Sequence, residues 1–480
     1  MSATAHQTPA ATTQAGRAWW RWGLALLPAV LLCCFTIHGL NAVQCRLLGV
    51  FIATIVALVT QPVPMGVTVL VAITALALTR TVPPATLFSG FANVTVWLIF
   101  TAFLFARAVT ATAFGTRLGY LFIRWFARSP LTLGYSLAAT GAVLAPFIPS
   151  DTARGGGIVF PTTRGLATAF GSEPGPTARR MGAFLMLTAF HTNYTVSAMF
   201  LTSMAANPLM AAVALKMAHI ELTWGRWFAG AIVPGLLTLL IVPYLIYRLH
   251  PPEIRNVQPA RELARRELER MGPLSRDERW LVGILLGVMA GWVTSPWHGI
   301  NNTFVALAGV SAILLARVLS WDDLLAEKKA WDALVWFAAL IMMTEALNDT
   351  GLIKFFSSAL FHRMTGWPWG MVLAALVAAY LYIHYTFAGM TAHATALYPA
   401  FLGAALAGGV PPLVAALPLA YFSSLDASLT HYGTGSAPVF YSAGYVGLGT
   451  WWRLGFLISL VDLAVWMGIG IGWWKLVGLW

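Results

Sequence analysis

The chain has 480 residues, of which 59% are hydrophobic and only 10% are charged, and its formal net charge is +12. Its mean hydropathy is +0.74. Soluble domains carry about 25% charged residues, so this composition excludes an ordinary soluble protein and predicts an all-α polytopic membrane protein. Lys and Arg concentrate in the loops expected on the cytoplasmic side, as the positive-inside rule requires. The positive charge therefore reflects topology, and no nucleic acid partner is expected.

The chain begins with a polar segment and one apolar run. Residues 1–21 contain no acidic residue and are rich in Ala and Thr, which predicts a cytoplasmic tail. No clear small-residue cleavage site follows the run 22–40, so we expect a transmembrane helix there and not a removed signal peptide. The three cysteines, Cys33, Cys34 and Cys45, lie in or beside this run. They provide neither a disulfide framework nor a four-ligand metal site.

A near repeat relates the two halves of the remaining chain. The string PSDTARGGG, which contains Thr152, returns as FAGMTAHAT, which contains Thr391. The offset that aligns these threonines also aligns Trp97 with Trp336. In membrane proteins such a duplication typically places a substrate site where the repeats meet, near the bilayer midplane. The repeat therefore indicates a transporter.

The repeats predict a symmetrical organisation. They cover 47–247 and 280–480, and each contributes about five crossings, which gives about 11 transmembrane helices in total. An odd number of crossings inverts the second copy. The interrupted stretches 131–170 and 370–410 hold the two motifs and are predicted to be re-entrant hairpins, because irregular backbone at membrane depth is tolerated only inside protein or beside water. The mixed-charge segment 248–279 is predicted to be a solvated cytoplasmic linker.

A polar-studded segment precedes each predicted hairpin, at 115–129 and at 352–366. The charged residues are Arg117, Arg124 and Arg128 in the first segment, and Lys354, His362 and Arg363 in the second. Such segments suit helices that lie in the interface plane and hold a fixed scaffold against which a hairpin-bearing unit moves. Ordinary loops with charged ends are the alternative.

Several strings carry a family resemblance. They are PSDTARGGGIVFP, GMTAHATALYPAFL, PPLVAALPLAYFSSLDASLTHYGTGSAPVFY and GYVGLGTWWRLGF. The chain resembles the divalent anion/sodium symporter family, in the exchanger branch of citrate/succinate and tartrate/succinate antiporters and 2-oxoglutarate/malate translocators. The resemblance implies an inverted-repeat, elevator-type carrier of di- or tricarboxylates, a homodimer in the bacterial inner membrane, whose hairpin-tip Ser-Asn-Thr motifs bind carboxylates. Asp151 and Met390 depart from those motifs, which puts the substrate's identity in doubt more than its class.

The chemistry of the tips supports the same class of substrate. A carboxylate that enters a low-dielectric site must exchange its hydration shell for donors. Short hydroxyls and backbone N–H groups at half-helix starts provide such donors, and Gly155, Gly156 and Gly157 let the backbone approach closely. The predicted substrate-binding residues are Ser150, Asp151, Thr152 and Arg154 on the first tip and Gly389, Met390, Thr391 and His393 on the second. The alternative is that the hydroxyls only bond to the preceding turn.

Arg154 and His393 follow the aligned threonines at the same step. Fixed cations beside both tips would offset the substrate's charge without sodium, which predicts sodium-independent antiport with no metal and no cofactor. The open alternatives are an Arg154–Asp151 ion pair, a satisfied interior His393, and a sodium- or proton-coupled symporter.

Polar breaks after the hairpins add a second set of candidates, because unwound backbone at midplane forms binding sites in such carriers. These candidates are Ser203, Asn207, Thr434 and Gly435. Glu345 and Asp349 are expected to pair within the scaffold. An intramembrane enzyme that uses His191, His384, His393 and His431 is the rival class, but no catalytic motif or metal-ligand spacing supports it.

Overall fold

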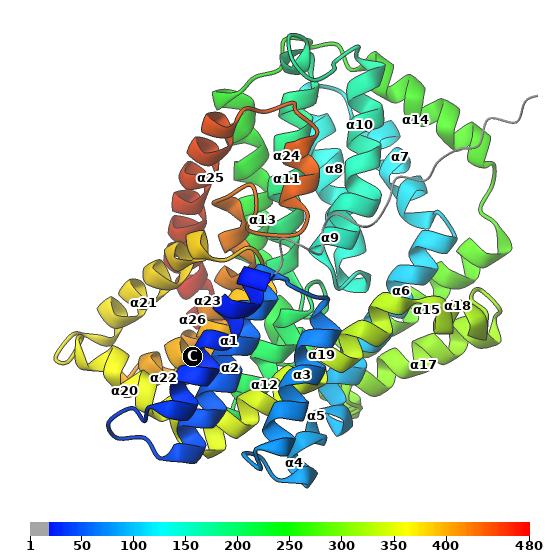
Figure 1. The fold of residues 1–480 in the computed structure, drawn as a ribbon. Coiled ribbons are helices and arrows are strands. Elements are labelled where there is room, and N and C mark those ends of the chain that lie inside the picture. The colour runs from blue at the N-terminus through cyan, green and yellow to red at the C-terminus, as the bar shows by residue number, and fades with distance from the viewer. Residues whose placement is uncertain (1–18) are drawn as a thin grey trace, which may run out of the picture.

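The computed structural model describes residues 19–480, and Figure 1 shows its fold. The predicted tail, 1–21, lies outside the described residues except for its last three positions. Helices account for all regular structure between residues 19 and 480, and no strand occurs there. The predicted all-α architecture is therefore confirmed.

The first repeat segment and the helix before it contain thirteen α-helices. They are α1 (Trp19–Cys34), α2 (Ala42–Thr60), α3 (Met65–Leu78), α4 (Pro84–Leu87), α5 (Ser89–Ala92), α6 (Val94–Ala111), α7 (Phe114–Phe126), α8 (Pro130–Leu144), α9 (Asp151–Arg154), α10 (Phe160–Ala169), α11 (Gly182–Met199), α12 (Ala206–Ala218) and α13 (Trp224–Leu249).

The connecting helix is α14 (Gln258–Met271). The second repeat segment contains α15 (Arg276–Val293), α16 (Ser295–His298), α17 (Asn302–Leu315), α18 (Trp321–Ala326), α19 (Lys328–Asp349), α20 (Leu352–His362), α21 (Trp369–Ile383), α22 (Met390–Ala407), α23 (Pro412–Leu425), α24 (Ala437–Ser442), α25 (Leu448–Asp462) and α26 (Gly470–Leu476).

Seven helical segments of the described chain are long and apolar enough to cross a membrane. They are Ala42–Thr60, Val94–Ala111, Pro130–Phe147, Trp224–Leu249, Lys328–Asp349, Trp369–Thr386 and Leu448–Leu476. Five further apolar helices have 10–17 residues, which is less than the roughly 20 needed to span the hydrocarbon core. The multi-pass character follows from these helices, and the count of about 11 crossings stays a prediction. Large apolar side chains such as Leu315, which is 84% exposed, face outward as a lipid-contacting surface requires.

The two motif-bearing stretches break at corresponding positions. In the first, α8 runs into a 3-10 turn at Ala145–Phe147, and α9 begins at Asp151. In the second, α21 runs into a 3-10 turn at His384–Thr386, and α22 begins at Met390. The two 3-10 turns start 239 residues apart (384 − 145), and so do the two helices that follow them (390 − 151). This is the offset that aligns Thr152 with Thr391. The arms after the breaks differ, because a π-helical turn at Gly155–Val159 separates α9 from α10, whereas α22 is continuous.

Helix α11 lies at the centre of the molecule. Every residue of Gly182–Met199 is buried, and the helix packs on α8, α10, α13 and α23. Buried side chains form two clusters: the larger contains both motif-bearing breaks, and the smaller joins α2, α3 and α19. Figure 1 shows α8 and α10 in the upper part of the molecule and α20–α22 at the lower left.

The segment between the repeats is docked on the first repeat. Helix α14 buries Ala260, Ala264 and Leu268 at helical spacing and packs on α7 and α10. Its charged residues lie on the other face, and the cytoplasmic location of the segment stays a prediction.

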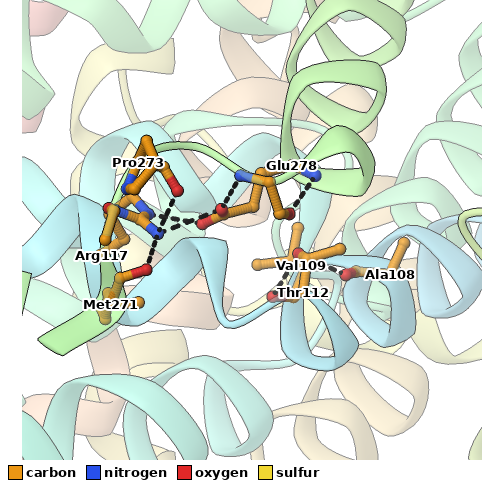
Figure 2. Close-up of polar contacts among 9 residues, drawn as sticks. Ala108, Val109, Thr112, Arg117, Met271, Pro273 and Glu278 are labelled. Atoms are coloured by element: carbon orange, nitrogen blue, oxygen red, sulfur yellow. Dashed lines mark hydrogen bonds and ion pairs between the residues drawn. The ribbon is translucent and has the colours of Figure 1, made fainter.

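Arg117 fixes the end of this segment. Its Nε lies 2.5 Å from Glu278 Oε1, and the two side chains are 8% and 2% exposed. Its Nη groups donate to the carbonyl oxygens of Met271, Gly272 and Pro273, so one guanidinium holds α7, the end of α14 and the start of α15 together (Figure 2). Arg117 is therefore buried and not interfacial, because an acidic partner and three carbonyls replace its water. The other five charged residues of the two polar-studded segments are exposed.

Candidate functional site

Arg154 is the most completely bonded side chain at the first break. Its Nε donates to Asn193 Oδ1, its Nη1 to the carbonyls of Ile148 and Ser203, and its Nη2 to the Asn193 carbonyl and Ser197 Oγ, over 2.5–3.1 Å. A guanidinium has five N–H donors, so all of them are used. The side chain is fully buried. Arg154 therefore has no donor left for a carboxylate, and the predicted direct contact becomes a positioning role.

Asp151 is held from both repeats. Asn193 Nδ2 donates to its backbone carbonyl at 3.0 Å and to Oδ1 at 2.5 Å, while Thr434 Oγ1 and Ser436 Oγ donate to Oδ2 at 2.7 and 2.5 Å. No ion pair joins Asp151 to Arg154 in the described structure. The amide of Asn193 lies between them and bonds to both, so the two opposite charges balance within one network.

The second break is built around Asp426, which follows the last turn of α23. His384 Nδ1 and His393 Nδ1 lie 3.1 and 2.9 Å from Asp426 Oδ2, and all three side chains are fully buried. His384 Nε2 also lies 2.9 Å from the Gly433 carbonyl, and His393 Nε2 lies 3.0 Å from the Tyr380 carbonyl. Within residues 19–480 this is the one group of three side chains that could hold a metal ion.

One short loop connects the two tips. Gly433 accepts from the second tip through His384, and the next residue, Thr434, donates to Asp151 of the first. A Cβ at Gly435 would overlap the Thr152 hydroxyl, so this position requires glycine. Consecutive Cα atoms are about 3.8 Å apart. The loop 433–436 therefore brings Asp151 of the first predicted tip and His384 of the second break to within a few residues' length of each other.

The two threonines of the repeat keep unused hydroxyls. Thr152 is exposed and Thr391 half-buried, and neither Oγ1 has a hydrogen-bond partner in the part of the chain that the structure describes. Ser150 caps α9 through a bond from Ala153 N. Gly389 precedes α22 and provides no side-chain cap, so the first N–H groups of α22 are free to face an anion.

Ser203, Asn207 and Met390 were also predicted to bind substrate, but they do not offer free donors at the tips. Ser203 Oγ and Asn207 Nδ2 both donate to the carbonyls of Ser197 and Phe200, so they satisfy the end of α11 and have no free donor aimed at the tips. Met390 is buried. These residues support the break instead of lining an open surface.

The surroundings of the predicted glycines differ, and the two predicted scaffold acids bond away from the tips. A Cβ at Gly155 would lie 2.5 Å from Asn193 Nδ2, whereas a Cβ at Gly157 would meet nothing within 4 Å. Only the first of these two positions needs close approach. Asp349 pairs with Lys216 of α12 at 3.0 Å, and Glu345 Oε2 accepts from Ser89 Oγ at 3.3 Å, so neither acid reaches a tip.

One cavity lies away from the tips. Its volume is about 400 Å³, and α6, α12, α19 and α20 line it, mostly with apolar groups; Lys216 and Glu345 are its charged side chains. It contains none of the predicted binding residues. We place the candidate site at the tips, because a dianion needs convergent donors and this cavity is largely apolar.

Comparisons with known proteins identify the family. The family described as "Sodium:sulfate symporter transmembrane region" matches residues 17–480. The chain belongs to this family. YflS of Bacillus subtilis, provisionally named a malate transporter, is 45% identical over 92% of this chain and 93% of its own. Dicarboxylate transporter 1 of Arabidopsis thaliana chloroplasts is 45% identical over 92% and 80%, and the L-tartrate/succinate antiporter of Shigella boydii is 32% identical over 96% and 98%.

Two solved structures share the fold at low identity. MtrF of Neisseria gonorrhoeae has a TM-score of 0.55 at 12% identity and matches 95% of this chain and 94% of its own. The YdaH transporter of Alcanivorax borkumensis has a TM-score of 0.52 at 17% identity and matches 82% and 86%. The resemblance seen in the tip strings is thus confirmed, and the chain is a membrane transporter and not an enzyme.

Sequence reasoning missed several residues that organise the site. Asn193 and Ser436 were not predicted, and His384 was considered only for an intramembrane enzyme. Asp426 was also missed, as was Asp462 of α25, although each lies inside an apolar run, where an ionisable residue indicates function. Both oxygens of Asp462 are buried without a hydrogen-bond partner among the described residues. A systematic search for acids within apolar runs would have found both aspartates.

Proposed function

We propose that the chain exchanges dicarboxylates by sodium-independent antiport. The named relatives support the substrate class, since they include a dicarboxylate transporter and a tartrate/succinate antiporter. The tips supply matching chemistry: the free hydroxyls of Thr152 and Thr391 and the open N-terminus of α22 offer donors to carboxylate oxygens. Each end of a dicarboxylate would bind one tip.

The bonding of Arg154 carries the antiport assignment. Its five acceptors are three backbone carbonyls, an amide oxygen and a hydroxyl. The carbonyls of Ile148 and Ser203 lie outside the helices, and carriers that couple to sodium use such unwound carbonyls to coordinate the ion. A fixed guanidinium occupies these oxygens, so this position needs no sodium ion. Arg154 is part of the protein and cannot dissociate as a sodium ion can, so no sodium gradient acts at this position, which favours sodium-independent exchange.

The separation of the buried core supports an elevator mechanism. Both breaks and the residues Leu429 and Ala437, which flank the loop 433–436, belong to the larger cluster, whereas α2, α3 and most of α19 belong to the smaller one. We propose that the larger unit carries substrate past a scaffold built on the smaller. We further propose a homodimer in the bacterial inner membrane.

Counterflow in proteoliposomes tests this function. Uptake of labelled succinate or malate should require unlabelled dicarboxylate inside the vesicles and should be the same in sodium and in choline medium. Sodium-driven accumulation in empty vesicles would refute antiport and would favour the sodium-coupled symport that the family's name describes. Acceleration by a proton gradient in empty vesicles would refute it in favour of proton coupling.

A further inference from the structure

The second break contains three ligand atoms from three elements. His384 lies in the turn after α21, His393 in the second turn of α22, and Asp426 after α23. One ligand atom of each residue lies within 4.8 Å of the other two, and the two Nδ1 atoms lie 3.1 and 2.9 Å from Asp426 Oδ2. The sequence separates these residues widely, so only the fold brings the three atoms together.

The outer nitrogens determine which form of each imidazole faces the centre. A backbone carbonyl can only accept, so Nε2 of His384 must donate to the Gly433 carbonyl and Nε2 of His393 to the Tyr380 carbonyl. A neutral imidazole that carries its proton on Nε2 presents a lone pair at Nδ1. Metal-binding histidines are oriented in this way, by donation from the other ring nitrogen to a carbonyl.

The inner atoms have no hydrogen-bond partners. Both Nδ1 atoms and both oxygens of Asp426 are buried without a partner among the described residues, although the N–O separations are short. The atoms are close enough to bond, but the rings are not aligned for N–H donation to the carboxylate. No Lys or Arg contacts Asp426 in residues 19–480. A buried carboxylate that faces two lone pairs requires a cation.

The size and the chemistry of the group suit one class of cation. Two of the three separations are 3.1 and 2.9 Å and the third is at most 4.8 Å, so a point between the atoms lies within about 2.4 Å of each, close to the roughly 2.0–2.2 Å of zinc–nitrogen and zinc–oxygen bonds. Imidazole nitrogen selects zinc and its neighbours, whereas sodium and magnesium favour oxygen ligands. We propose that His384, His393 and Asp426 bind one divalent transition metal ion of the zinc type.

Such an ion would join both arms of the second break to the end of α23. The three protein ligands leave one tetrahedral position for water or another small ligand. The first break uses the five bonds of Arg154 for the same task, so the two repeats would hold their tips with different cations: one fixed, one exchangeable. This site does not depend on the direction or coupling of transport.

Metal content tests the proposal on the full chain, purified in detergent through a tag without histidine. Elemental analysis after exposure to equimolar zinc and desalting should give close to one zinc per chain. Co²⁺ in place of zinc should produce the visible absorption bands of a four-coordinate site. The His384→Gln and Asp426→Asn variants should each bind zinc at least tenfold more weakly, because each loses a ligand. His431→Gln is the matched control, since this nearby histidine bonds Trp452 outside the group, and it should bind zinc as the wild type does.

The spectrum of the wild type needs no variant, so a variant that does not fold leaves the proposal testable. A wild-type chain that stays metal-free at equimolar zinc and shows no Co²⁺ bands would overturn the proposal, and protons would then be the cations that neutralise Asp426. Equal loss of zinc in His431→Gln would overturn it too, because the metal would then be bound elsewhere.

Discussion

Replacement of Arg154 by lysine distinguishes the role of its positive charge from the role of its five hydrogen-bond donors. Lysine keeps the positive charge but has three donors against five, so at least two of the five buried acceptors lose their partner. A hydrogen bond to a charged group contributes about 1.5–3 kcal/mol, which gives an expected loss of about 3–6 kcal/mol. That is a large share of the roughly 5–15 kcal/mol by which proteins are stable. We therefore expect a clear fall in the thermal midpoint in detergent.

The companion measurement is counterflow at several substrate concentrations. If Arg154 positions the tip without touching substrate, Arg154→Lys should lower the number of active carriers more than it raises the KM of those that remain. Arg164→Lys is the matched control, because Arg164 is exposed on α10 of the same arm, and it should match the wild type in both assays. An Arg154→Lys protein with wild-type stability and a tenfold higher KM would refute the positioning role and restore direct substrate contact.

Two further sets of variants address the tips. Thr152→Ala and Thr391→Ala should each raise the KM of counterflow by up to roughly tenfold, since a neutral hydrogen bond contributes about 0.5–1.5 kcal/mol. Thr110→Ala, on the outside of α6, is the control and should not change the KM. An equal effect of all three variants would show that the tip hydroxyls do not bind substrate. Gly155→Ala should lower the thermal midpoint because its Cβ would collide with a buried side-chain amide. Gly157→Ala, which meets nothing, should match the wild type or exceed it slightly, and similar losses in both would contradict the close-approach argument.

The sequence predicted the fold class and the place of the breaks because both leave periodic or repeated signals. Apolar runs separate a membrane protein from a soluble one, and the strings around Thr152 and Thr391 locate corresponding points of the two halves. The packing of α14 on α7 and α10 was not predicted, because its apolar stripe of Ala260, Ala264 and Leu268 is small and lies among many charged residues.

Partner choice within the site could not be predicted from spacing. Asp151 was expected to bind substrate, with an ion pair to Arg154 as the alternative, whereas its carboxylate bonds three neutral donors, two of them from the other half of the chain. Ser203 and Asn207 were recognised as polar groups at a break, but which carbonyls they satisfy depends on where α11 ends. Such pairings depend on long-range packing, which leaves no trace in local sequence.

The bonds between Asp151 and the loop 433–436 also constrain how the protein is made. Thr434 and Ser436 follow Asp151 by 283 and 285 residues, and ribosomes add about 5–20 residues per second, so a delay of roughly 15–60 s separates the carboxylate from two of its three side-chain donors. During that interval the first tip carries a charge that the bilayer interior disfavours. We therefore expect the first tip to settle only after the second half has been made, and a chain that stops before residue 434 to be degraded faster than the full chain.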